Sequence, residues 1–313
     1  MAVIGYYNGR FVDPAEGVVP IEERGHEFGD GVYEVIRVYA GRPFLLEWHI
    51  ERLLNSLSAV RIASPHDALG YKELIQTAIA KSGEREASVY LQVTRGAALR
   101  NHLFPEGEIA PAVSLVVRPV TTHPSACVGT LLAQADERWA NVYIKTINLL
   151  PNILAKQTAH DAGADEALLV RDGYMLEAAS SNLWFVRDGA LITAPTDRYI
   201  LPGITRRFVL DLAADLQIPV YEQKLPYTQL ARVEGMFLTG TTTEIFPIGE
   251  VITHPHCPIE ATLPSVAPHP LAVEPEGCTR IWQAANLELV HQLRSAFDAR
   301  IQQFRNANAA STT

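Results

Sequence analysis

Hydrophobic and polar positions alternate in short runs over the first third of the chain, and longer helical runs separate them. Residues 31–39 read GVYEVIRVY, a β-branched and aromatic strand with Tyr33, Val35, Arg37 and Tyr39 on one face. An Asn8-Gly9 pair before it predicts a hairpin over residues 6–12. Apolar residues spaced three and four apart predict helices over 46–57 and 69–81, followed by strands at 87–95 and 113–117.

The polar, proline-bearing stretch 118–125 predicts a domain boundary. Beyond it we expect strands near 128–136 and 141–146, a helix over 151–162, and hairpins at Asp172-Gly173 and Asp188-Gly189. A further helix begins after Gly203 with Thr205 as its N-cap, 252–278 is irregular, and a last helix runs over 279–304. The prediction is a two-domain α+β protein: a small N-terminal α/β domain over 1–120, a linker over 121–133 and a larger C-terminal domain over 134–313.

Composition narrows the class of protein. The chain has 313 residues, 48% hydrophobic, with a net charge of −9, which argues against nucleic acid as the main partner. No apolar run approaches the ~20 residues of a membrane helix, and no secretory signal is visible at the start. Three cysteines without a CxxC pair favour a cytoplasmic location. The histidines and Cys257 between 254 and 269 fit no standard zinc spacing, so we predict no metal site.

Lys145 lies in the mostly apolar segment 142–147, which is an unusual setting for a lysine. The segment is compatible with an edge-strand lysine that points to water. A Schiff-base lysine is the other interpretation, because an apolar pocket favours the uncharged, nucleophilic amine.

Glu177 follows a predicted hairpin and precedes a run of small and polar residues that ends at Asn182. It reads either as a turn carboxylate or as a carboxylate that keeps a cofactor's ring nitrogen protonated.

Three places offer groups that bind phosphate. Gly203-Ile204-Thr205 opens a helix, so its N–H groups and dipole favour an anion. Residues 239–243 (TGTTT) form a loop of hydroxyl and N–H donors, and Arg52 lies on the first long helix. Each is weak alone, and their joint presence with an apolar-flanked lysine is more informative.

The pair Arg100 and His102 follows a predicted strand. With one residue between them, both side chains can point the same way and grip one carboxylate, although a basic surface loop has the same pattern.

Several of these segments together resemble one known family. The segments 24–35 (RGHEFGDGVYEV), 93–96 with 100–102, 145–150, 177–182 and 201–206 occur in the order found in fold type IV pyridoxal-phosphate enzymes. The similarity is greatest to the D-amino-acid transaminases of that family and spans about residues 5–250. It implies a pseudo-barrel for the C-terminal domain and pyridoxal 5'-phosphate as cofactor.

The resemblance also implies a role for each candidate residue. Lys145 would bind the cofactor aldehyde and move the substrate proton, and Glu177 would bind the pyridine nitrogen. The remaining cofactor contacts would come from Arg52, Ser180, Ser181, Leu201, Ile204, Thr205 and Thr241. The substrate contacts would come from Tyr33, Val35, Arg37, Arg100, His102 and Thr242. In that family the Arg–His pair comes from the neighbouring subunit, so a homodimer is implied.

The expected activity is transfer of an amino group from a D-amino acid, such as D-alanine or D-glutamate, to a 2-oxo acid in a ping-pong reaction. Three alternatives stay open: a branched-chain L-amino-acid aminotransferase, an aminodeoxychorismate lyase and a non-catalytic dimer of the same fold. Arg37 matches the branched-chain enzymes, whereas the Arg100–His102 pair does not. Ala178-Ala179 and Gly240 depart from the residues usual in the family.

Overall fold

The computed structural model describes residues 3–120, 127–259 and 274–307. The chain divides into two compact units. The first comprises Met1–Thr122, Ile144–Leu149 and Phe304–Thr313, and the second comprises His123–Tyr143 and Leu150–Gln303.

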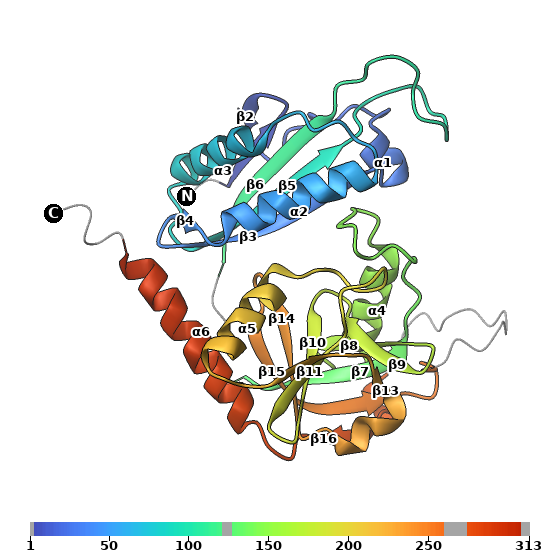
Figure 1. The fold of residues 1–313 in the computed structure, drawn as a ribbon. Helices are drawn as coiled ribbons and strands as arrows, with labels where there is room; N and C mark the ends of the chain where they lie inside the picture. The colour runs from blue at the N-terminus through green and yellow to red at the C-terminus, as the bar shows by residue number, and fades with distance from the viewer. Residues whose placement is uncertain (1–2, 121–126, 260–273, 308–313) are drawn as a thin grey trace. The chain divides into compact units, whose positions relative to one another are not determined.

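The first unit is a six-stranded sheet with two helices against it (Figure 1). The strands lie in the order β2-β1-β6-β5-β3-β4, and every pairing is antiparallel. Their bounds are β1 Ile4–Tyr7, β2 Arg10–Val12, β3 Gly31–Tyr39, β4 Arg42–Pro43, β5 Ala87–Thr94 and β6 Ala112–Pro119. The helices are α1 Arg24–Phe28, α2 Leu46–Ala59 and α3 Ala68–Ser82. The hairpin at Asn8-Gly9 is confirmed, and both of its turn residues have positive φ.

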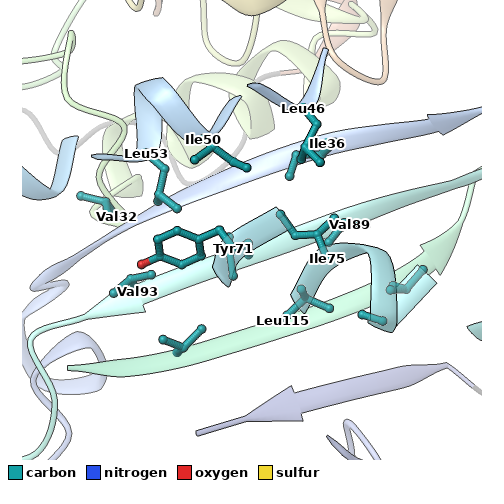
Figure 2. Close-up of a cluster of buried hydrophobic side chains, with 14 of the residues drawn as sticks. Val32, Ile36, Leu46, Ile50, Leu53, Tyr71, Ile75, Val89, Val93 and Leu115 are labelled. Carbon is teal, nitrogen blue, oxygen red and sulfur yellow. The ribbon is translucent and has the colours of Figure 1, made fainter. Parts of the chain in front are cut away.

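Alternation along β3, β5 and β6 turns one face of this sheet toward α2 and α3. Figure 2 shows the cluster that results, with Val32 and Ile36 of β3 beside Leu53 of α2 and Ile75 of α3. These side chains are at most 1% exposed. Each contributes about 1.5–3 kcal/mol by leaving water. The opposite face of β3, with Tyr33 and Val35, stays outside this cluster.

The second unit is a ten-stranded sheet that closes on itself. The path β12-β11-β10-β14-β15-β7-β8-β9-β13 returns from β9 to β10, and β16 pairs with β15. The bounds are β7 Gly129–Ala135, β8 Glu166–Arg171, β9 Tyr174–Ala178, β10 Asn182–Arg187, β11 Ala190–Thr193, β12 Val220–Glu222, β13 Leu225–Pro226, β14 Gly235–Gly240, β15 Glu244–Thr253 and β16 Thr279–Gln283. The closing pair is Asn182 with Glu177. The expected α+β fold with a C-terminal pseudo-barrel is confirmed.

The helices of the second unit are α4 Leu150–Asp161 and α5 Ile204–Asp215, together with the short 3-10 turns η1 Tyr227–Arg232 and η2 Pro275–Gly277. The last helix, α6, runs over Glu288–Asn306. The hairpins at Asp172-Gly173 and Asp188-Gly189 are confirmed, joining β8 to β9 and β10 to β11.

Three predicted elements are wrong. Residues 141–146 form turns with a single bridge, Val32 to Thr146, because no continuous partner strand lies beside them. Residues 279–283 form strand β16, since β15 offers them a free edge. Gly203 rather than Thr205 is the N-cap of α5, so the helix begins two residues earlier.

The two units differ from the predicted domains, because residues 129–133 of the expected linker lie in β7 and two later segments belong to the first unit. Ile144–Leu149 and Phe304–Thr313 belong to the first unit, although both follow the second unit's first strand in the sequence. Backbone hydrogen bonds from Tyr33 to Lys145 and from Ile147 to Gly31 tie the first of these segments to β3. Part of the irregular stretch predicted at 252–278 lies outside the described residues. None of the helices in the described ranges has the length and apolar character needed to cross a membrane.

Candidate active site

Lys145 lies on an irregular segment that crosses the first residues of β3. Its carbonyl accepts from the Tyr33 N–H at 2.9 Å, and its own N–H donates to Ser56 Oγ at 3.3 Å. The side chain is half-buried, and Nζ lies 4.1 Å from the centre of the Tyr33 ring. The structure therefore brings together two of the predicted residues, the amine of Lys145 and the phenol ring of Tyr33.

Two glycines permit this crossing. Gly29 has φ +67° and ends α1, and a Cβ there would lie 3.0 Å from Cβ of Asn148. A Cβ on Gly31 would lie 2.8 Å from the Val93 carbonyl and 3.1 Å from Ile147. Only glycine leaves room for the segment that carries Lys145.

Arg52 is buried on α2 and faces a carboxylate of β3. Its Nε and Nη2 donate to the two oxygens of Glu34 at 2.7 and 2.8 Å, and Glu34 also pairs with His49 Nδ1 at 2.8 Å. Burial by itself raises the pKa of Glu34, but the charge and hydrogen bonds of Arg52 and His49 outweigh it and lower the pKa to about 2. Burial lowers the pKa of His49. The guanidinium is thus fixed in direction before any ligand arrives.

Glu177 is the centre of a buried polar network at the closure of the barrel. Arg138 donates to one carboxylate oxygen, and Asn182 Nδ2 donates to the other at 2.8 Å. Arg138 in turn donates from Nε and Nη2 to the two carboxylate oxygens of Asp136, at 2.8 and 2.9 Å. Burial, the largest cause, raises the pKa of Glu177, and Asp136 adds to this effect while Arg138 opposes it. The carboxyl group is therefore buried away from water, held in a fixed direction, and able to accept a strong hydrogen bond from an N–H group.

The start of α5 and the turn after β14 meet near this network. A Cβ on Gly203 would overlap the side-chain amide of Asn182, and no side chain caps the helix. A Cβ on Gly240 would lie 3.0 Å from Ser181 Oγ and 3.3 Å from Thr243 Oγ1. Backbone N–H groups, hydroxyls and a helix dipole thus converge around Ser181 and Asn182, a donor set that fits a phosphate.

The other predicted cofactor residues of this region belong to the second unit. Ile204 and Thr205 are buried in the first turn of α5, and Thr241 is half-buried in the turn between β14 and β15. Leu201 accepts from Asn182 Nδ2 through its carbonyl at 2.9 Å. Ser180 is exposed, and its hydroxyl donates to Glu166 at 2.6 Å and accepts from Lys156 at 3.3 Å. Thr242 is exposed.

Arg100 and His102 lie on the loop that follows β5. Both are exposed in the single chain, with 62% of the Arg100 side chain accessible. The ring of Phe28 lies beneath both: the Arg100 guanidinium carbon is 5.0 Å from its centre and the His102 ring centre is 5.7 Å away. The structure therefore places both side chains against the same aromatic ring.

Arg37 and Val35 complete the predicted substrate residues. Val35 is half-buried on the same face of β3 as Tyr33. Arg37 is 2% exposed and is used internally: it donates to the Ala87 carbonyl at 3.1 Å and to Glu86 at 3.3 Å. Its guanidinium also lies over the ring of Tyr39.

Sequence reasoning missed the residues that hold the candidate groups in place, namely Phe28, Glu34, His49, Asp136 and Arg138. A signal for Glu34 was present, because a carboxylate on the apolar face of a strand needs a cation. Asp136 and Arg138 follow a buried strand with one residue between them, a pattern that by itself does not distinguish a surface pair from a buried one.

The closed barrel, the buried carboxylate network and the phosphate-type cradle define an aminotransferase architecture. The sequence profile described as amino-transferase class IV matches residues 31–251, and the chain belongs to that family.

Its relatives include curated D-alanine aminotransferases. The enzyme of Listeria monocytogenes is 38% identical over 78% of this chain and 86% of its own length. That of Bacillus licheniformis is 36% identical, over 78% and 87%. Among solved structures, a branched-chain amino acid aminotransferase of Escherichia coli is 25% identical with a TM-score of 0.79, covering 96% of this chain and 94% of its own. One from Thermoproteus uzoniensis, with norvaline, is 27% identical with a TM-score of 0.72, covering 79% and 86%.

Proposed function

We propose that the protein is a pyridoxal-phosphate-dependent transaminase that moves the amino group of a D-amino acid to a 2-oxo acid. The observation that carries the D-specific part is the Arg100–His102 pair on its shared aromatic ring. Relatives named D-alanine aminotransferases, at 33–38% identity, support the same activity.

The residues present fit the cofactor. The first turn of α5, Ser181 and the turn after Gly240 would hold its phosphate, with Arg52 as the charged partner. Glu177 would accept a hydrogen bond from the protonated ring nitrogen and keep it protonated, and Leu201 would pack against the ring. When bound, pyridoxal 5'-phosphate supplies an aldehyde for the amino group and an electron-withdrawing ring.

The chain's own groups orient the substrate and move its proton. Lys145 Nζ would take the proton from the substrate Cα and deliver it to the carbon of the cofactor's aldehyde group, and the second half-reaction would run this transfer in reverse. Tyr33, whose ring lies 4.1 Å from that amine, limits the directions in which the amine can point. The Asp136–Arg138–Glu177 chain keeps the carboxylate from turning away from its partner, so no reorganisation is needed as charge develops.

Handedness follows from where the substrate carboxylate is held. A substrate of the opposite hand would place its side chain against Arg100 and His102 and remove their partner. In the proposed dimer, where the partner subunit would cover Arg100, leaving this charge unpaired would cost about 3–5 kcal/mol, or two decades or more of discrimination.

A branched-chain L-amino-acid aminotransferase is the second candidate, because the solved structures with that name share the whole fold. Arg37, the residue that matches that group, is bound to Glu86 and Ala87. The D-amino-acid activity is therefore favoured.

We further propose a homodimer. The loop that carries Arg100 and His102 exposes Leu99 at 80% and Leu103 at 73%, an apolar surface typical of an interface. The described cysteines are all free thiols, which supports a cytoplasmic location.

Half-reaction spectra of the cofactor-loaded protein test the activity. D-Alanine and D-glutamate should convert the aldehyde form to the amine form at least about a hundredfold faster than L-leucine, since handedness is set by how Arg100 and His102 hold the substrate carboxylate in the proposed dimer. Conversion by L-leucine alone would contradict the D-specific proposal, and pyruvate release from aminodeoxychorismate would indicate the lyase.

A further inference from the structure

Two guanidinium groups and one imidazole ring lie close to the ring of Phe28. Arg100 and Arg24 both place their guanidinium carbons near its centre, at 5.0 and 4.9 Å. The His102 ring stands 5.7 Å away, tilted by 50°. The negative face of an aromatic ring attracts cations and favours a flat approach by guanidinium groups.

The platform beneath these groups is rigid. Phe28 is the last residue of α1, between the N-cap Glu23 and the left-handed Gly29. Arg24 is buried, pairs with Asp30 at 2.8 Å and donates to the Asn101 carbonyl at 2.7 Å. It therefore fixes the backbone of the residue between Arg100 and His102.

Glu27, the neighbour of Phe28, faces one edge of the Arg100 side chain. Its Oε1 lies 3.8 Å from Arg100 Nε, and its Oε2 is buried without a hydrogen-bond partner among the described residues. A carboxylate on the Nε side leaves the terminal Nη edge of the guanidinium for a second carboxylate, such as that of a substrate.

We propose that Phe28 is a positioning residue for substrate carboxylate recognition: its ring sets the direction of Arg100 and His102. This inference rests on the proposed function. A long exposed arginine loses side-chain entropy when it binds, and a stacked one has already lost part of it. The gain appears in carboxylate binding and not in the movement of the proton by Lys145.

Steady-state kinetics of F28L with D-alanine test the proposal. Loss of the aromatic face should raise KM about tenfold, with kcat changed less than about twofold. F28Y keeps the ring and should remain within about twofold of wild type. The half-reaction with D-alaninol, which has no carboxylate, should be equally fast in F28L and wild type.

The matched control is F104L. Phe104 lies on the same loop and stacks on Arg95 at 3.8 Å and Arg61 at 4.6 Å, and no interaction joins it to Arg100 or His102 among those the structure describes. F104L removes an aromatic ring from the same loop without touching Arg100 or His102, so it shows whether a general disturbance of the loop raises KM. Its KM for D-alanine should stay within about twofold of wild type.

A second readout does not depend on activity. In protein with isotope-labelled histidine rings, the His102 signal, assigned with H102N, should lose its ring-current shift in F28L and keep it in F28Y and F104L. If F28L does not fold, F28M, which is apolar and has no aromatic face, is judged by the same criteria.

An unchanged KM in F28L, or an equal loss with D-alaninol, overturns the positioning role. So would a KM increase of the same size in F104L. Failure of the proposed function is distinguishable, because wild type would then be inactive with every D-amino acid while the His102 ring-current test still reports on the stacking.

Discussion

At the scale of single residues, the candidate site consists of charges that are buried and held by other charges. Glu34 is fully enclosed between Arg52 and His49, and Glu177 between Arg138 and Asn182. Such pairs add little net stability, but removing one partner leaves an uncompensated charge in a dry interior. They fix direction, which is what a group must have before it binds a phosphate or a ring nitrogen.

Acid should therefore unfold the protein in a window set by Glu34. The folded carboxyl has a pKa of about 2, below its ordinary 4.5, so the unfolded chain binds more protons between these values. Stability is present above pH 4.5 and is lost as the pH falls toward 2, by about 3 kcal/mol from this group. His49, whose pKa is also lowered, adds a loss that begins below its ordinary 6.5.

Urea unfolding at a series of pH values measures this loss. E34Q should be less stable at pH 7, by about 3–5 kcal/mol, and should lose less stability than wild type below pH 4.5, where Asp30 and Asp136, whose pKa values are also lowered by arginine partners, still contribute. E47Q is the control: Glu47 lies on α2, the helix that carries Arg52 and His49, and 74% of its side chain is exposed. Parallel declines in wild type and E34Q would refute the assignment.

At the scale of elements, glycine-ended α1 and the start of β3 allow the segment with Lys145 to cross the sheet. Gly29 and Gly83 are left-handed C-caps, of α1 and α3, with nearly equal φ of 67° and 69°. They differ in their surroundings: Asn148 lies over Gly29, whereas a Cβ on Gly83 would meet nothing within 4 Å.

The G29A and G83A variants separate backbone strain from this close approach. Both should lose about 1–2 kcal/mol of stability from the positive φ. Only G29A should also lose transaminase activity, about tenfold or more, because Asn148 must move and Lys145 is three residues away. The measurements are kcat/KM and the free energy of unfolding of each variant. Equal kcat/KM for G29A and G83A would contradict the prediction, because it would show that the segment carrying Lys145 can shift without loss of activity.

At the scale of the whole molecule, the exposed Arg100 and His102 have their proposed role only across a subunit interface. Mixing inactive K145A with inactive R100A tests this directly after the subunits are exchanged. In the mixed dimer one site would combine an intact Lys145 with the other subunit's Arg100, so activity should return to that site.

Mixing K145A with E177Q is the control, because both residues are proposed to serve their own subunit's site and no complete site can form. Activity restored in the control, or not restored in the K145A–R100A mixture although sedimentation shows mixed dimers, would contradict the shared site.

The sequence by itself determined the elements and the chemical inventory. Period-two and period-3.6 patterns located β3, α2 and α3, and turn pairs such as Asn8-Gly9 located the hairpins, because burial of one face and left-handed backbone are local constraints. The motifs around Lys145 and Glu177 indicated the family, because the identity and order of residues can be read without the fold.

Only the tertiary structure decided how these groups are held. Residues 141–146 look like a strand, but a strand requires a neighbour, and the segment crosses β3 instead. Arg37 lies on the strand face predicted to contact substrate, but in the structure it donates to Glu86. The sequence pattern could not predict this contact, because Glu86 lies far away in sequence. Glu34 with Arg52, Arg138 with Glu177, and Phe28 with Arg100 are all pairings between elements, and local patterns cannot specify which buried charge or ring lies opposite.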